Sequence, residues 1–137
     1  RTRRPWAPGP VTLRRWARLA AGSCRGELGI RVVGSRESRA LNGQWRGRDK
    51  PTNVLSFPAS PDLRGRQLGD LVVCAPVVAR EAREQGKPLT AHWAHMIVHG
   101  TLHLLGFDHE RVADARRMES RERALLARLG IADPYGG

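Results

Sequence analysis

All five histidines of this 137-residue chain fall between positions 92 and 109. Four of them, His92, His95, His99 and His103, follow one another at intervals of three or four residues. At about 100° per residue in an α-helix, these side chains fall within an arc of about 80°. Apolar residues occupy both flanks of that arc. The segment 89–105 is therefore predicted to be a largely buried helix that carries one polar stripe.

A bound metal ion explains this stripe better than four separate core histidines, each with its own backbone or carboxylate partner. Imidazoles four residues apart on a helix can converge on one ion, at nitrogen–metal distances of about 2.0–2.1 Å. Residues eight apart are about 12 Å apart, so His95, His99 and His103 cannot all be ligands. Gly106 can adopt a positive φ and fold His109 back toward the helix. We predict His99, His103 and His109 as the ligands of one zinc ion per chain.

The spacing of these three histidines is that of the metzincin proteases. Three imidazoles leave a fourth coordination position for water, which is typical of a catalytic site. In the proteases a glutamate general base follows the first histidine, but here Gly100 stands in that place. Its missing side chain disfavours peptide hydrolysis and is expected to leave room near the metal for a bulky substrate.

Asp108 is either an alternative base or a carboxylate that orients a ligand. His92 and His95 either line the cleft that leads to the metal or are core histidines.

Apolar periodicity and turn residues predict the remaining elements. Helices are expected at 11–21, from Ser35 through 41, at 76–85 and at 111–129, and strands at 28–33, 53–57 and 68–74. Gly43 and Gly47 are expected to interrupt the second helix. The pattern indicates an α+β fold (an α/β sandwich) with about five helices and a small mixed sheet of three to four strands. We expect one domain over 1–137, with residues 1–25 forming a peripheral arm and helix.

The amino-acid composition indicates which kinds of protein this chain can be and which kinds of partner it can bind. With 40% hydrophobic and 27% charged residues, neither disorder nor a membrane protein is expected, and cytoplasmic residence is the default. The formal net charge of +11 suits a polyanionic partner such as RNA, or reflects a GC-rich genome. Aromatic residues are only 5% of the chain, which argues against an extensive base-stacking platform. Cys24 and Cys74 are expected to be reduced thiols.

The run from His99 to His109, His-Gly-Thr-Leu-His-Leu-Leu-Gly-Phe-Asp-His, resembles the signature of the YbeY endoribonucleases, which are bacterial ribosomal RNA maturation factors. Phe107 stands where the family usually has a tyrosine. Other segments are also similar to family sequences: Lys-Pro-Thr-Asn-Val-Leu-Ser-Phe-Pro at 50–58, Leu-Gly-Asp-Leu at 68–71, Glu-Gln-Gly-Lys-Pro at 84–88 and Ala-His-Trp-Ala-His at 91–95. The likeness runs from about Gly26 to Tyr135.

The resemblance implies zinc bound by the motif histidines and a functionally important arginine ahead of the Lys-Pro-Thr-Asn segment, here Arg46. His99 and Arg46 would be the catalytic residues. If the loop 43–51 overhangs the metal, the Arg46 guanidinium can hold the scissile phosphate by paired hydrogen bonds. Asn53 and Ser56, on a strand beside the ligand helix, are candidates for holding substrate. Asn53 is equally suited to satisfying the turn at the start of that strand.

The function implied is that of a zinc-dependent endoribonuclease that cleaves single-stranded ribosomal RNA, in 3′-end maturation of the small-subunit RNA and in ribosome quality control. Its partners would be ribosomal RNA and the small ribosomal subunit, with neither DNA nor membrane expected. The nucleophile is either water or the RNA 2′-hydroxyl group. Two other functions remain open at this point: a zinc peptidase or amidase, and a ribosome assembly factor whose zinc is structural.

Overall fold

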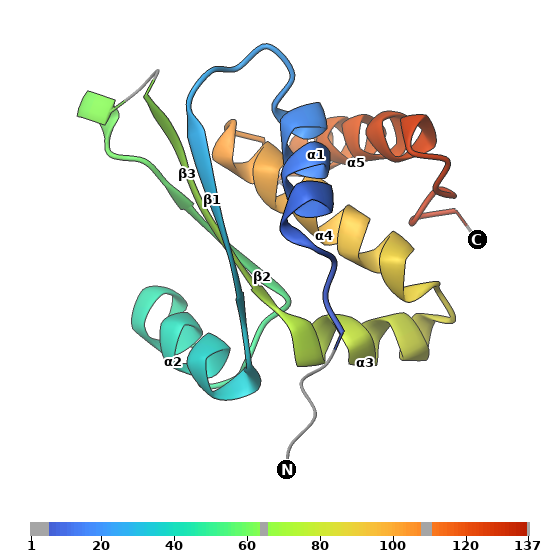
Figure 1. Cartoon of the computed structure of the whole chain (residues 1–137), viewed down its shortest axis with the longest axis horizontal. Helices are drawn as coiled ribbons and strands as arrows, with labels where there is room; N and C mark the ends of the chain where they lie inside the picture. Colours follow the sequence, from blue (N-terminus) through green and yellow to red (C-terminus); the bar gives the residue numbers. More distant parts are fainter. Residues whose placement is uncertain (1–5, 64–65, 108–110, 137) are drawn as a thin grey trace.

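The computed structural model describes residues 6–63, 66–107 and 111–136 (Figure 1). Within these ranges the α-helices are α1 (Pro10–Ala21), α2 (Ser35–Arg46), α3 (Ala75–Gln85), α4 (Leu89–Leu104) and α5 (Val112–Arg128). The strands are β1 (Glu27–Val33), β2 (Val54–Pro58) and β3 (Gln67–Cys74), and a short 3₁₀ turn, η1, spans Pro61–Leu63. The chain has the predicted α+β fold, and all of the predicted helices and strands are present.

The strands form one mixed sheet in the order β1-β3-β2. The central strand β3 runs parallel to β1 and antiparallel to β2, with Leu71 opposite both Ile30 and Ser56. Since side chains alternate along a strand, β3 contributes to the hydrophobic packing on both faces of the sheet. Leu71 and Val73 pack into the main core, whereas Val72 and Cys74 pack with residues of α2 and β2.

Helix α4 is the centre of the main core. It contacts α1, α3, α5, β2 and β3, and α2 covers the opposite face of the sheet (Figure 1). Trp93, Ile97 and Leu102 of α4 are completely buried. The apolar flanks of the histidine helix thus pack in the core, as its periodicity predicts, and the polar stripe lies between them.

Helix α1 is part of this core rather than peripheral. Leu13, Trp16, Ala17 and Ala20 are buried against α4, and Gly22 ends the helix with φ of +60°. These are the apolar positions that predict the helix, and their helical spacing places them on one face. The expectation that residues 1–25 are peripheral is therefore wrong for Pro10–Ala21.

Helix α2 differs from its predicted form at both ends. Ser35 is its first residue, not its cap, because Gly34 takes the cap position. The helix continues through Gly43 to Arg46 and ends at Gly47, whose φ of +67° is left-handed.

Buried polar side chains on helix α2 bind the following loop. Ser38 Oγ donates to Thr52 O at 3.0 Å, and Asn42 Nδ2 donates to Lys50 O at 2.8 Å. These bonds stabilise the longer helix despite the glycine.

The two cysteines are free thiols, Cys24 exposed and Cys74 buried. In the described part of the chain, every helix falls short of the length or the apolar character needed to cross a bilayer.

The burial of α1 generates a stability prediction. Trp16→Ala should lower the free energy of unfolding by about 3–5 kcal/mol, because it removes a large side chain that is 6% exposed. Trp45→Ala is the matched control, since Trp45 is 63% exposed, and should cost less than about 1 kcal/mol. Urea unfolding followed by circular dichroism measures both. Equal losses would contradict the placement of α1 in the core.

Candidate metal centre

The histidine stripe forms a continuous row of rings along α4. Ring centroids are 6.1 Å apart for His92 and His95, 6.1 Å for His95 and His99, and 4.9 Å for His99 and His103. Burial decreases along the row: the side chain of His92 is 3% exposed, that of His95 10% and that of His99 22%. The row therefore runs from the protein interior toward solvent.

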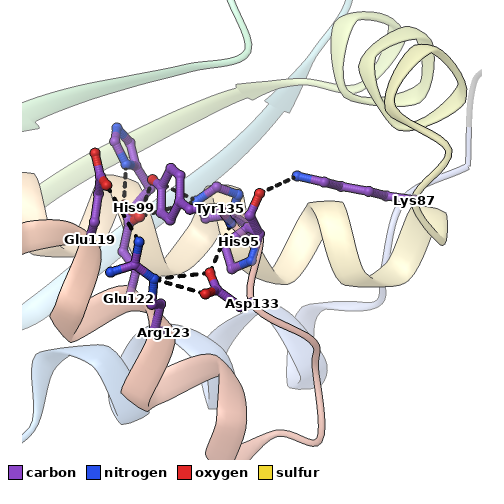
Figure 2. Close-up of polar contacts among 9 residues, drawn as sticks. Lys87, His95, His99, Glu119, Glu122, Arg123, Asp133 and Tyr135 are labelled. Carbon is purple, nitrogen blue, oxygen red and sulfur yellow. Dashed lines mark hydrogen bonds and ion pairs between the residues drawn. The ribbon is translucent and has the colours of Figure 1, made fainter. Parts of the chain in front are cut away.

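A glutamate from α5 binds two of these histidines. Glu122 is completely buried, and its Oε1 lies 2.5 Å from His99 Nδ1 while its Oε2 lies 3.2 Å from His95 Nε2. The hydroxyl of Tyr135 also donates to Oε2 (Figure 2). Helices α4 and α5 and the C-terminal residues thus meet at one buried carboxylate.

Sequence analysis missed Glu122, although the sequence holds a signal for it. On α5 it lies on the same face as Met118, Leu125 and Leu126, which are all buried. A carboxylate on an apolar helix face requires partners, because an unpaired buried charge is costly. The histidine partners of Glu122 lie 23 and 27 residues earlier in the chain, so its role follows only from the fold.

The hydrogen bonds determine the charge of this group. Burial by itself would raise the pKa of Glu122, but the hydrogen bonds with His95 and His99 outweigh it and lower the pKa to about 2. Burial, together with the hydrogen bond to Glu122, raises the pKa of the Tyr135 phenol above its ordinary value. At neutral pH the site therefore holds a carboxylate that accepts hydrogen bonds and a neutral phenol that donates one.

Two sets of side chains could hold a metal here, and both include His99. His95, His99 and Glu122 each bring one ligating atom to within 4.8 Å of the others. Ligand atoms of a tetrahedral zinc site are about 3.3 Å apart, given bonds of about 2.0–2.1 Å. The 2.5 Å between His99 Nδ1 and Glu122 Oε1 is instead a hydrogen-bond distance. This geometry suits a carboxylate that orients a ligand imidazole through Nδ1, so that a metal would be bound by Nε2.

The second set is His99, His103 and His109, and the structure describes its first two members. His103 lies one turn beyond His99 with its ring beside that of His99. Gly106 has the predicted positive φ, +97°, and its N–H donates to His103 O, so the chain turns directly after the helix. His109 and Asp108 lie outside the described residues. Two adjacent imidazoles beside an orienting carboxylate fit a divalent transition metal.

Gly100 has a different role from the one expected. A Cβ at this position would lie 2.9 Å from Leu71 Cδ2 and 3.1 Å from Val54 Cγ2, both on the sheet. Ser56 Oγ donates to Gly100 O at 2.9 Å from the neighbouring strand. The residue after His99 therefore faces the sheet. Its missing side chain allows α4 to approach the sheet closely, and the expectation that it leaves room for substrate is wrong.

Asn53 and His92 meet at a second carboxylate, Glu81 of α3. Asn53 Nδ2 lies 3.2 and 3.3 Å from the two Glu81 oxygens, and His92 Nε2 lies 2.9 Å from Oε1. Asn53 Oδ1 also accepts from the Val54 N–H at 2.7 Å. The Asn53 side chain thus organises the start of β2, as in the turn interpretation, and His92 is a core histidine with a carboxylate partner.

Arg46 is exposed at the last position of α2. Its neighbour Trp45 contacts Phe57 of β2, with ring centroids 5.4 Å apart. Helix α2 packs on the opposite face of the sheet from α4, so Arg46 is not part of the histidine row.

The Glu81 network generates a pH prediction. Burial would raise the pKa of Glu81, but hydrogen bonds from His92 and Asn53 lower it below its ordinary 4.5. A carboxyl whose pKa is lower in the folded state stabilises that state above pH 4.5, and this contribution is lost as the pH falls through the folded pKa. Glu81→Gln should therefore cost most stability above pH 5 and progressively less toward pH 3, measured by urea unfolding. Glu84→Gln, exposed on the same helix, should show no such dependence; a constant cost for Glu81→Gln would contradict the prediction.

Comparison with known proteins places the chain in a family. The family model described as "Endoribonuclease YbeY" matches residues 13–130. A Halorhodospira halophila protein named "Endoribonuclease YbeY" is 65% identical over 115 residues, covering 80% of this chain and 75% of the relative. Another of that name, from Alkalilimnicola ehrlichii, is 60% identical over 136 residues, covering 93% and 82%. The solution structure of TM1509 from Thermotoga maritima shares the fold, with a TM-score of 0.55, 23% identity and 96% coverage of both chains. With these matches and the histidine row, the chain belongs to the endoribonuclease YbeY family.

Proposed function

We propose that this chain is a zinc-dependent endoribonuclease that cleaves single-stranded ribosomal RNA. Its relatives carry the name endoribonuclease, and the observation that supports a catalytic metal is the hydrogen bond between buried Glu122 and His99 Nδ1. This bond fixes the orientation of an imidazole on the exposed part of the histidine row. His99, His103 and His109 are the proposed ligands. Three protein ligands leave one position open for chemistry.

The residues of the chain have separate tasks in this mechanism. A zinc ion, when bound, supplies Lewis acidity and activates water near neutral pH. Glu122 holds the His99 imidazole in place. Arg46 lies outside the histidine row, on a helix that packs against the opposite face of the sheet, and its proposed task is to hold the scissile phosphate of bound RNA and stabilise the charge that develops on it. Attack by water leaves a 5′-phosphate on one product. Attack by the RNA 2′-hydroxyl leaves a 2′,3′-cyclic end instead.

The proposed substrate is ribosomal RNA of the small subunit, in 3′-end maturation and quality control in the cytoplasm. The net charge of +11 supports binding to a polyanion. The low aromatic content of 5% favours recognition through phosphates and the ribosomal context over base stacking.

A second candidate function follows from the other ligand set. A metal held by His95, His99 and Glu122 would be buried and would link α4 to α5. Such a site is structural, and the protein would then be a ribosome assembly factor without nuclease activity. Because the two sets share only His99, variants of the other ligands distinguish the two functions.

The first test measures zinc content and cleavage of a single-stranded ribosomal RNA fragment. His103→Ala and His109→Ala should each lose both the zinc ion and cleavage, since each removes a ligand of the catalytic set. His95→Gln should keep zinc, because it removes no ligand of the catalytic set and the glutamine amide still offers Glu122 a hydrogen-bond donor. Loss of zinc in His95→Gln but not in His103→Ala would overturn the catalytic assignment and favour the structural site. Zinc is quantified by mass spectrometry and products are resolved on denaturing gels.

A separate test addresses Arg46. Arg46→Lys should lower the cleavage rate by about 100-fold and leave zinc content unchanged, because an ammonium group cannot make the paired hydrogen bonds of a guanidinium. Arg36→Lys is the matched control on the same helix, where the arginine is also exposed. A cleavage rate for Arg46→Lys equal to that of the control would remove Arg46 from the mechanism.

A further inference from the structure

The residues after α5 fold back over the histidine row. Gly130, with φ of +74°, turns the chain after α5, and the Ile131 N–H donates to Leu126 O at 2.9 Å. Residues 131–135, which we call the C-terminal strap, then pass beside α4 (Figure 2). Ile131 packs against the main core. The strap is thus anchored at its start by an apolar contact and a backbone hydrogen bond.

Polar contacts hold the rest of the C-terminal strap. Arg123 Nε donates to both oxygens of Asp133, at 3.1 and 2.9 Å, and its guanidinium lies 5.4 Å from the centre of the Tyr135 ring. Lys87 Nζ donates to Pro134 O at 3.0 Å, and Asp133 Oδ1 accepts from the Tyr135 N–H at 2.8 Å (Figure 2). None of these contacts involves the Tyr135 hydroxyl. The strap and the tyrosine ring therefore have supports that do not depend on that group.

The Tyr135 hydroxyl links the C-terminal strap to the histidine row by way of Glu122. It donates to Oε2 of Glu122, and it lies 3.2 Å from His95 Nε2. The opposite oxygen, Oε1, faces His99 Nδ1. A carboxylate is planar, so groups that fix Oε2 also fix the direction of Oε1. The orientation of the His99 ring depends in turn on Oε1.

We propose that Tyr135 is a positioning residue of the metal centre, whose hydroxyl fixes the Glu122 carboxylate and through it the His99 imidazole. The inference rests on the proposed function in taking His99 as a metal ligand. As a neutral donor, Tyr135 binds the carboxylate without cancelling its charge, so Glu122 remains a strong acceptor for His99. His95 Nε2 already lies 3.2 Å from the same oxygen, so loss of the phenol leaves Oε2 with one donor fewer.

Tyr135→Phe in the full chain tests this proposal, since it removes the hydroxyl and keeps the ring over Arg123. In the metal-free protein, the ¹⁵N shifts of the His99 imidazole report which ring nitrogen carries the proton. The wild type should show a predominantly Nδ1-protonated ring, and the variant a more averaged signal. Competition with a chromophoric chelator should show zinc binding weakened by about 10-fold or more, in the range for loss of an orienting partner.

Lys87→Gln is the matched control, because it removes a bond of the strap to Pro134 O and leaves the hydroxyl in place. It should retain the zinc affinity and the His99 signals of the wild type. Unchanged affinity and unchanged His99 signals in Tyr135→Phe would overturn the proposal, as would equal losses in the Lys87→Gln control. If the wild type binds no zinc but Tyr135→Phe still changes the His99 signals, the proposed function fails while the positioning role stands.

Discussion

The buried carboxylate of Glu122 is the interaction on which the arrangement of the site depends. It is completely buried, and an ionised group in that position is tolerated only when hydrogen bonds replace the lost water. Those bonds come from α4 through His95 and His99 and from the C-terminal residues through Tyr135. None of these partners lies on α5. The need to hydrogen-bond the buried carboxylate therefore determines both how α5 packs and how the histidines are oriented.

Helix α4 meets two demands that normally conflict. Its flanks must be apolar enough to fill the core between α1 and the sheet, and its stripe must carry imidazoles that need polar partners. Glu81 and Glu122 supply these partners from α3 and α5 for the buried members of the row, His92 and His95. The more exposed members follow along the same helix, so one element carries both part of the core and the proposed metal ligands.

Local signals in the sequence predicted the helices, the strands, the turn at Gly106 and the histidine row, because periodicity and turn residues act over a few positions. Partnerships between distant segments were missed. Glu122 lies 23 residues from His99, and Glu81 lies 28 residues from Asn53, so neither role is visible in a local pattern. The interruption expected at Gly43 failed for the same reason, since bonds from Ser38 and Asn42 to the loop outweigh the glycine's low helix propensity.

The close approach of α4 to the sheet at Gly100 bears on how this scaffold can change its chemistry. A Cβ at that position would lie too close to side chains of Leu71 and Val54, so a carboxylate placed there would begin against the sheet. Introducing a protease general base here would therefore also require α4 or these neighbours to move. The packing of α4 against the sheet thus keeps this fold from acquiring the general base of the metzincin proteases, although the spacing of its histidines is the same as theirs.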